Sequence, residues 1–155
     1  ESRPILSRMK DKRDATRMSV GTEAPDLARL LSARGVSPTV KRLQIAEVLL
    51  RGHQHLSADQ VLARVNGGEH RVSKATVYNT LGLFARKGLV REVIVDPSRV
   101  FYDSNTSEHH HFYNIDSGEL IDIDSRSMAV DSLASLPSGT VLEDVDVIIR
   151  VRNAT

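Results

Sequence analysis

Three consecutive histidines, residues 109–111, lie in a stretch of the chain that is rich in aspartate and glutamate. Histidine is a common ligand of metal ions and titrates close to neutral pH. In an extended segment His109 and His111 point to one face and His110 to the other. Two imidazoles on one face supply half of a metal site. The acids near enough in sequence to complete it are Asp103, Glu108, Asp116, Glu119, Asp122 and Asp124.

The charge of the chain changes sign along its length, although the whole carries only +1. Residues 26–96 have eleven Lys and Arg against six acids, a net +5, and residues 97–155 have four against ten, a net −6. A basic first part suits a polyanion such as DNA, and an acidic second part suits cations. The alternative interpretation is a chance distribution of solvated charge.

Four helices are predicted between residues 26 and 88, each with start and stop signals. The first covers residues 26–33. The second has Ser37 as its N-cap and Pro38 at the first helical position, where proline is favoured. The third opens with Ser57 and Gln60, which fit a capping box.

The fourth helix opens at Ser73 and repeats apolar residues at helical spacing. The period then changes. Residues 89–95 and 100–103 are rich in β-branched and aromatic residues, and residues 96–99 form a turn. Helices followed by such a two-stranded wing predict a winged helix-turn-helix, in which the fourth helix reads DNA.

The second half of the chain is predicted as strands around one helix. The strands cover residues 109–115, 119–124 and 141–151, and the helix covers residues 127–136. About 50 residues are marginal as an independent unit, so pairing with a second copy would supply the missing burial.

We therefore predict an α+β chain in three parts. Residues 1–24 form an N-terminal arm, residues 25–103 a winged-helix DNA-binding domain, and residues 104–155 a small α/β dimerisation and ligand-sensing domain. There is no apolar run near the ~20 residues that a membrane helix needs, so no membrane partner is expected.

The start of the fourth helix carries side chains suited to double-stranded DNA. Lysine, threonine and tyrosine can hold phosphates, Asn79 can pair with adenine, and Tyr78 or the Ala75 methyl can contact a thymine methyl. The alternative is an ordinary amphipathic helix with a solvated face. The candidate DNA-binding residues are Arg71, Ser73, Lys74, Ala75, Thr76, Tyr78 and Asn79.

Residues 35–42, 55–58, 75–81 and 88–90, followed by the histidine run, resemble the ferric uptake regulator superfamily. The resemblance extends in order over about residues 26–152. It implies a winged-helix domain joined by a hinge to an α/β dimerisation domain. It also implies a metal- or oxidant-responsive transcription regulator that is a homodimer and binds a DNA operator.

The resemblance also implies a sensing site between the domains. The family's ligand positions are filled here by His55, Asp103, His109, His111 and Asp122. Three imidazoles and two carboxylates suit Fe(II), Mn(II) or Zn(II) better than Cu(I). An ion that held ligands from both domains would fix their relative angle, and with it the spacing of two recognition helices.

The chain departs from most relatives in having no cysteine. Asn114 and Ser117 stand where relatives carry a Cys-X-X-Cys pair, so a structural tetrathiolate zinc is excluded and packing alone must hold the dimer. Asn79 stands where many relatives have arginine, and Ser37 where many have a basic residue, so base preference is expected to differ. The absence of cysteine is also consistent with a cytoplasmic protein.

One branch of the family, the iron response regulators of alphaproteobacteria, combines absent cysteines, a triple histidine and Asn79. Residues 145–150 also resemble that branch. The resemblance implies haem ligation around His109, His110 and His111, with control of iron and haem metabolism genes. A histidine axial ligand is chemically reasonable.

Two alternatives remain open at this point. The first is a manganese-, zinc- or peroxide-responsive repressor of the same superfamily, in which the histidines bind only a divalent ion. The second is a metal-dependent hydrolase. The sequence contains no His-Glu-X-X-His, no glycine-rich phosphate loop and no serine nucleophile elbow, which disfavours an enzyme.

Overall fold

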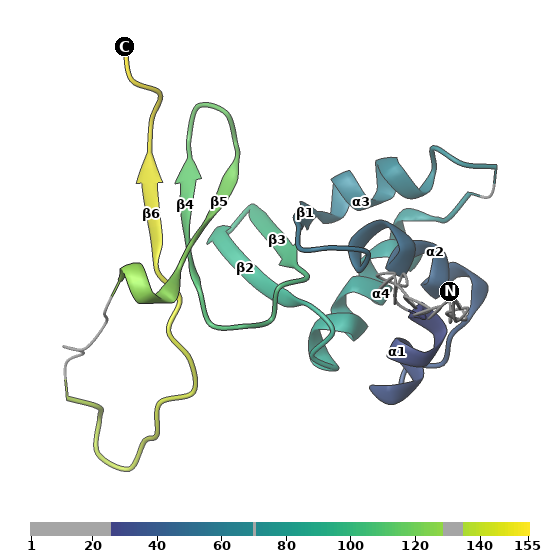
Figure 1. The fold of residues 1–155 in the computed structure, drawn as a ribbon, viewed down its shortest axis with the longest axis horizontal. Helices are drawn as coiled ribbons and strands as arrows, with labels where there is room; N and C mark the ends of the chain where they lie inside the picture. Colours follow the sequence, from purple (N-terminus) through teal and green to yellow (C-terminus); the bar gives the residue numbers. More distant parts are fainter. Residues whose placement is uncertain (1–25, 70, 129–134) are drawn as a thin grey trace, which may run out of the picture.

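The computed structural model describes residues 26–69, 71–128 and 135–155. Helices lie at one end and a three-stranded sheet at the other, with a second three-stranded sheet between them (Figure 1). The predicted α+β class is confirmed. Within these ranges no helix is long and apolar enough to cross a membrane. The arm over residues 1–24 lies outside the described part, and the two domain boundaries stay a prediction.

The four α-helices of the described ranges form because each has a side-chain cap and apolar residues on one face. Their bounds are α1 Leu27–Ala33, α2 Val40–Leu49, α3 Ala58–Val65 and α4 Lys74–Arg86. The side-chain oxygen of each N-cap residue accepts a hydrogen bond from the backbone N–H three residues later. The helix itself leaves that N–H unpaired. The caps are Asp26, Thr39, Ser57 and Ser73. The capping box of Ser57 and Gln60 is confirmed.

The start of α2 corrects the prediction. Thr39, not Ser37, is the N-cap, because its hydroxyl accepts the N–H of Arg42 at 3.3 Å. Pro38 therefore lies before the cap instead of in the first turn. Val40, the first residue of α2, is 72% exposed. The residues of α2 that do reach the core are Ile45, Ala46 and Leu49.

The central sheet, which we call the wing sheet, contains β1 His55–Ser57, β2 Arg91–Asp96 and β3 Arg99–Asp103. The order is β1-β3-β2, and both pairings are antiparallel. The predicted two-stranded wing is thus completed by a third strand that sequence reasoning missed. A three-residue strand is too short to show an alternating pattern. It matters because it places His55 directly opposite Asp103.

The outer sheet contains β4 His110–Asn114, β5 Leu120–Ile123 and β6 Ile148–Val151, in the order β5-β4-β6. The hairpin of β4 and β5 agrees with the prediction, and Gly118 supplies the positive φ of 73° in its turn. β6 pairs with β4 in parallel.

Two predictions for the second half need correction. The last strand begins at Ile148 and not at residue 141, because the preceding segment is largely exposed and two of its acids bind the wing sheet. The predicted helix over 127–136 is not seen at its ends: Ser125–Ser127 form a 3-10 turn, η1, and Leu136 is not helical. Its middle, residues 129–134, lies outside the described residues.

The two sheets share a small apolar core. The wing sheet contributes Val93, Val95 and Phe101, and the outer sheet contributes Tyr113, Leu120 and Ile148. Polar contacts frame it. Arg91 of β2 binds Asp144 at 2.7 Å and Asp146 at 2.5 Å, and Arg150 of β6 donates to the Val95 carbonyl. Packing that does not involve an ion therefore already sets the sheets against one another.

Removing the Arg91 side chain should destabilise the protein. Arg91→Ala would leave two partly exposed carboxylates without their shared cation, at an expected cost of about 1 kcal/mol in the free energy of unfolding. Urea unfolding of the ion-free protein measures it. Arg29→Ala, an exposed position on α1, is the control and should stay within about 0.5 kcal/mol of wild type. Equal stabilities for all three proteins would show that this contact contributes nothing.

Candidate metal centre and DNA-facing helix

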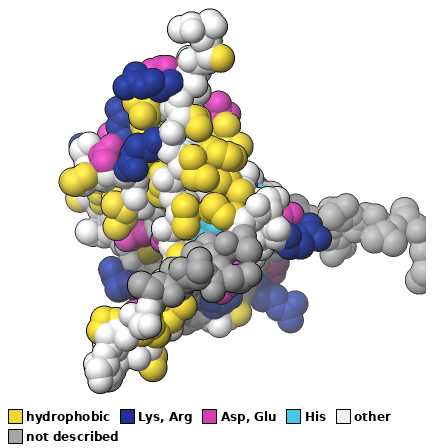
Figure 2. All heavy atoms as spheres, turned by 90° about the vertical axis from the view of Figure 1, so that its left-hand side faces the viewer, with side chains coloured by type: hydrophobic (Ala, Val, Ile, Leu, Met, Phe, Trp, Pro, Cys, Tyr) yellow, Lys and Arg dark blue, Asp and Glu magenta, His cyan; other side chains and the backbone are white. Residues whose placement is uncertain are grey.

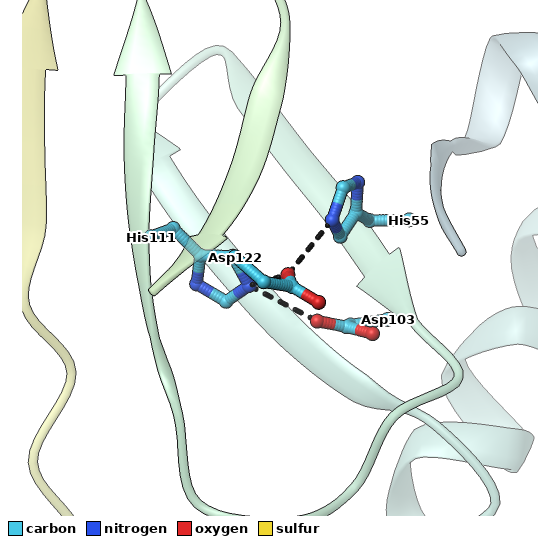
Figure 3. Close-up of side chains that lie close together, drawn as sticks. All are labelled: His55, Asp103, His111 and Asp122. Atoms are coloured by element: carbon cyan, nitrogen blue, oxygen red, sulfur yellow. Dashed lines mark hydrogen bonds and ion pairs between the residues drawn. The ribbon is translucent and has the colours of Figure 1, made fainter. Parts of the chain in front are cut away.

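The candidate metal centre is built from two cross-strand pairs, one in each sheet. His55 lies opposite Asp103 between β1 and β3, and His111 lies opposite Asp122 between β4 and β5. Directly opposed residues of antiparallel strands project to the same face. The two sheets pack together, so the four side chains converge (Figure 3). His109, just before β4, joins them through Asp103.

His55 is held in this register by Ser104, the residue after β3. The N–H of Gln54 donates to Ser104 Oγ, and the N–H of Ser104 donates to the Gln54 carbonyl, both at 3.0 Å. Ser104 Oγ donates in turn to the Gly52 carbonyl at 2.6 Å. These bonds clamp the strand that precedes α3 onto the end of β3, which explains how a residue 48 positions before Asp103 comes to lie beside it.

The five predicted ligands form one connected cluster. Nε2 of His109 and of His111 lie 2.8 and 3.0 Å from Asp103 Oδ2. Asp122 Oδ1 lies 2.9, 3.5 and 3.3 Å from Nε2 of His55, His109 and His111 respectively.

These separations suit coordination as well as hydrogen bonding. Ligands about 2.1 Å from one ion lie about 3 Å from each other when their directions are perpendicular. One ligand atom from each of His55, Asp103, His111 and Asp122 lies within 4.8 Å of all the others. Imidazole nitrogens with carboxylate oxygens are donors for Fe(II), Mn(II) or Zn(II). The residues therefore fit a divalent ion.

The cluster is closed on one side and open on the other. Asp103 and His111 are 0% and 1% exposed, whereas the Asp122 side chain is 42% exposed. Burial opposes ionisation of Asp103, but hydrogen bonds from His111, the Asn105 N–H and His109 outweigh it and hold the pKa of Asp103 below its usual value. Asp103 is thus a carboxylate at neutral pH, buried and in place, while Asp122 faces the side from which an ion would arrive.

The tautomer of His109 suits the binding of a cation. Its Nδ1 lies 2.7 Å from the Ser107 carbonyl, which can only accept, so Nδ1 carries a proton. Nε2, which faces Asp103, must then either carry a second proton or present its lone pair to a cation shared with the carboxylate. A backbone carbonyl that fixes the tautomer in this way is a common support for metal-binding histidines.

His110 does not belong to this cluster. It projects from the opposite face of β4, and its Nδ1 accepts the N–H of Val147 at 3.3 Å. It is nearly buried, at 9% exposure, and joins β4 to the segment before β6. Its visible role is to hold the outer sheet together.

Haem does not fit these histidines as the structure places them. His109 and His111 direct Nε2 at a buried carboxylate, and His110 is covered. A cavity of about 440 Å³ beside His109 is lined by Ile123 and by polar or acidic residues, namely Asn105, Ser107, Glu108, Asp122, Asp124 and Ser125. A porphyrin has apolar faces and anionic propionates, and this lining suits neither.

The other acids near the histidine run have different contacts. Asp124 pairs with Arg126, whose hydrogen bonds lower the pKa of that carboxyl to about 2. Asp116 accepts the N–H of Asn153 at 2.9 Å and pairs with Arg152. Asn114 donates to Asn153 Oδ1 at 2.8 Å. Polar contacts thus tie the end of the chain to the β4–β5 hairpin.

Helix α4 presents a continuous exposed stripe. Lys74, Ala75, Tyr78 and Asn79 are exposed, and they fall on one arc because their spacing is one and four residues. Arg71 before the helix is also exposed. The opposite face is buried through Val77, Leu81 and Phe84, each 0% exposed, as the sequence predicts.

Ser73 and Thr76 are engaged in the cap of α4. Ser73 Oγ accepts the N–H of Thr76 at 3.1 Å and donates to Thr76 Oγ1 at 2.9 Å. Two of the seven predicted DNA-binding residues therefore form the cap of α4. The other five take no part in this cap.

Comparison with known proteins places this arrangement in context. The sequence model of the ferric uptake regulator family matches residues 33–149. The peroxide-responsive repressor PerR of Staphylococcus aureus is 30% identical over 104 residues, which are 67% of this chain and 70% of the repressor.

Solved structures show the same fold. The ferric uptake regulator of Vibrio cholerae is 23% identical with a TM-score of 0.65, over 82% of this chain and 99% of that one. The ferric uptake regulator of Pseudomonas aeruginosa with manganese is 24% identical with a TM-score of 0.63, over 84% of this chain and 100% of that one.

Proposed function

Starting from the fact that this chain belongs to the ferric uptake regulator family, we propose that it is an iron-responsive repressor controlling iron and haem metabolism genes. Proteins of this family are dimeric, metal-responsive transcription regulators and not enzymes, which removes the hydrolase alternative. The observation that carries the proposal is the convergence of His55, Asp103, His111 and Asp122 from two sheets, with His109 joined to them through Asp103. Helix α4 of the same chain exposes a stripe suited to DNA.

The metal centre would connect the wing sheet, and with it the helices, to the outer sheet. A bound divalent ion would supply the charge that holds imidazoles and carboxylates of both sheets together. His55 and Asp103 come from the wing sheet, which is continuous with the helices, while His109, His111 and Asp122 come from the outer sheet. Any change in how these residues meet is transmitted to the orientation of α4, and thus to the fit of two helices on DNA.

We propose direct sensing of Fe(II) ahead of haem sensing. The ligand set and its spacing support the ion, and the burial of all three histidines disfavours a porphyrin. A haem-responsive regulator of the iron response type remains the second candidate, supported by the cysteine-free sequence and the triple histidine. A manganese-, zinc- or peroxide-responsive repressor is the third.

Parallel titrations of the ion-free protein with Mn(II) and with haem separate divalent-ion sensing from haem sensing. We expect one Mn(II) per chain, lost when His109, His110 and His111 are all changed to alanine, and no stoichiometric Soret shift with haem. Tight haem binding that disappears in the same variant would establish the second candidate and overturn direct sensing.

A second copy of the chain is proposed to cover the outer face of the outer sheet. Ile121, Phe112 and Ile149 are neighbours in one row across the three strands, and the two isoleucines are 44% and 36% exposed. Figure 2, which looks onto this side, shows hydrophobic side chains gathered there. An apolar face of this kind supports the homodimer expected from the family.

Lys74 is expected to contact a DNA phosphate. Lys74→Ala should weaken binding to all DNA sequences alike and reduce the slope of log affinity against log salt concentration by about one unit, because one fewer counterion is released. Fluorescence anisotropy at several salt concentrations measures the slope. Arg126→Ala removes the same charge beside the outer sheet and should leave it unchanged. An unaltered slope for Lys74→Ala would remove this residue from the phosphate contacts.

A further inference from the structure

Tyr78, the most prominent aromatic group of the exposed α4 stripe, is held by two neighbours. Its hydroxyl donates to Asp59 Oδ1 at 3.2 Å, and Asp59 lies in the first turn of α3. The ammonium of Lys74 lies 5.5 Å from the centre of the Tyr78 ring, within the range of a cation–π contact. The side chain is nevertheless 41% exposed, so its outer surface remains available.

Tyr78 lines a cavity. It has a volume of about 420 Å³ and lies between the start of α3, Tyr78 and residues 97–102 of the wing sheet. A phenol side chain is smaller than this space. Asp59 lines the same cavity and binds the hydroxyl at its edge. Without that bond the cation–π contact with Lys74 would remain, but it does not fix the direction of the hydroxyl.

We propose that Asp59 is a positioning residue for sequence recognition: it fixes the orientation of Tyr78 on α4 and thereby sharpens discrimination between DNA sequences. The inference rests on the proposed function, in which α4 reads DNA. Asp59 itself is an acid and would not bind phosphate. Its carboxylate acts through the tyrosine hydroxyl, by selecting one orientation of the ring before DNA arrives, which lowers the ordering cost of binding.

A carboxylate beside a DNA-reading helix also has an electrostatic effect that opposes binding. Its negative charge repels phosphate and weakens attachment to every sequence alike. The same negative charge stabilises α3, because it lies in the first turn of that helix. A test must therefore separate the hydrogen bond from the charge. Asp59→Asn and Asp59→Ala remove the charge equally, but only the asparagine keeps an oxygen that can accept the Tyr78 hydroxyl.

The experiment uses the full chain with Mn(II) and a DNA duplex selected from a random library by the wild-type protein. The quantity measured is the ratio of affinities for this duplex and for a scrambled one. We expect the ratio for Asp59→Ala to fall about 3- to 10-fold below that for Asp59→Asn, which corresponds to one hydrogen bond. The melting temperatures of the two variants should agree. Agreement excludes a folding defect, which would lower the affinities for the selected and the scrambled duplex together.

Repeating the pair in a Tyr78→Phe background completes the test. With the hydroxyl absent, Asp59→Ala and Asp59→Asn should have the same ratio. A difference that persists there, or no difference in the tyrosine background, would overturn the positioning role. If the wild-type protein selects no sequence at all, the proposed function fails instead. If Tyr78→Phe lowers the ratio while both Asp59 variants match each other, DNA reading by α4 stands and only this inference falls.

Discussion

Asp103→Ala is expected to lower the affinity for Mn(II) by about 100-fold or more. Outer partners of a metal site are already worth 10- to 100-fold, and Asp103 is placed as a ligand. It is the carboxylate shared by His109 and His111, and it is fully buried. Its removal would leave two imidazoles facing each other without an anion between them. Isothermal titration of the ion-free protein measures the affinity directly.

The matched control is Asp124→Ala, a neighbouring acid that pairs with Arg126 and not with the histidines. It should bind Mn(II) as wild type does. In the wild type, affinity should weaken as pH falls, because ligating histidines must be neutral and ion binding releases their protons. Retention of wild-type affinity by Asp103→Ala, with a normal melting temperature, would remove this residue from the metal centre.

The double variant Tyr78→Ala/Asn79→Ala is expected to lose about 100-fold in affinity for the selected DNA sequence. One well-placed side chain contact to a base contributes about 1–3 kcal/mol, and two adjacent contacts on one exposed face would be lost together. Both residues lie on the exposed stripe of α4, so the helix and its buried face should stay intact. Anisotropy titrations with selected and scrambled duplexes measure the effect.

Affinity for the scrambled duplex serves as the internal control. It should change only a few-fold, because phosphate contacts from Arg71 and Lys74 are retained. Equal losses on both duplexes would show that the variant is simply less well folded. Unchanged affinity for the selected duplex would rule out α4 as the DNA reader.

Helix positions in this chain are predictable because their signals are local. Ser57 with Gln60, and Ser73 before an apolar repeat, fix two helix starts within a few residues. Local signals fail where two of them compete. Ser37-Pro38-Thr39 offers two possible caps, and the structure selects Thr39, whose hydroxyl reaches the Arg42 N–H. No pattern within the segment distinguishes the two choices.

The ligands of the candidate metal centre could likewise be predicted only where they lie close together in the sequence. The alternation along β4 puts His109 and His111 on one face with His110 opposite, as the sequence predicts. The sequence alone offers six nearby acids, and the pairing of β4 with β5 is what places Asp122 opposite His111. His55 could not be found in this way, because its contact with Asp122 spans 67 residues and depends on how the two sheets pack. Only family resemblance pointed to it.

The end of the outer sheet was mispredicted for a similar reason. Residues 145–151 have a β-branched apolar residue at every second position, which favours a strand, and the prediction extended it back to residue 141. In the structure Asp144 and Asp146 instead bind Arg91 of the wing sheet. A long-range ion pair thus overrides a local preference. The Tyr78–Asp59 hydrogen bond was missed because it joins two helices across 19 residues and depends on how they pack.

The most direct test of the central claim is the affinity for the selected DNA duplex as a function of free Mn(II), measured by anisotropy in wild type and in Asp103→Ala. We predict that affinity changes by at least about 10-fold across the Mn(II) concentration that fills one site per chain, and that the variant shows no such change. Wild-type DNA affinity that stays constant from ion-free to ion-saturated protein would contradict a metal centre that controls DNA binding.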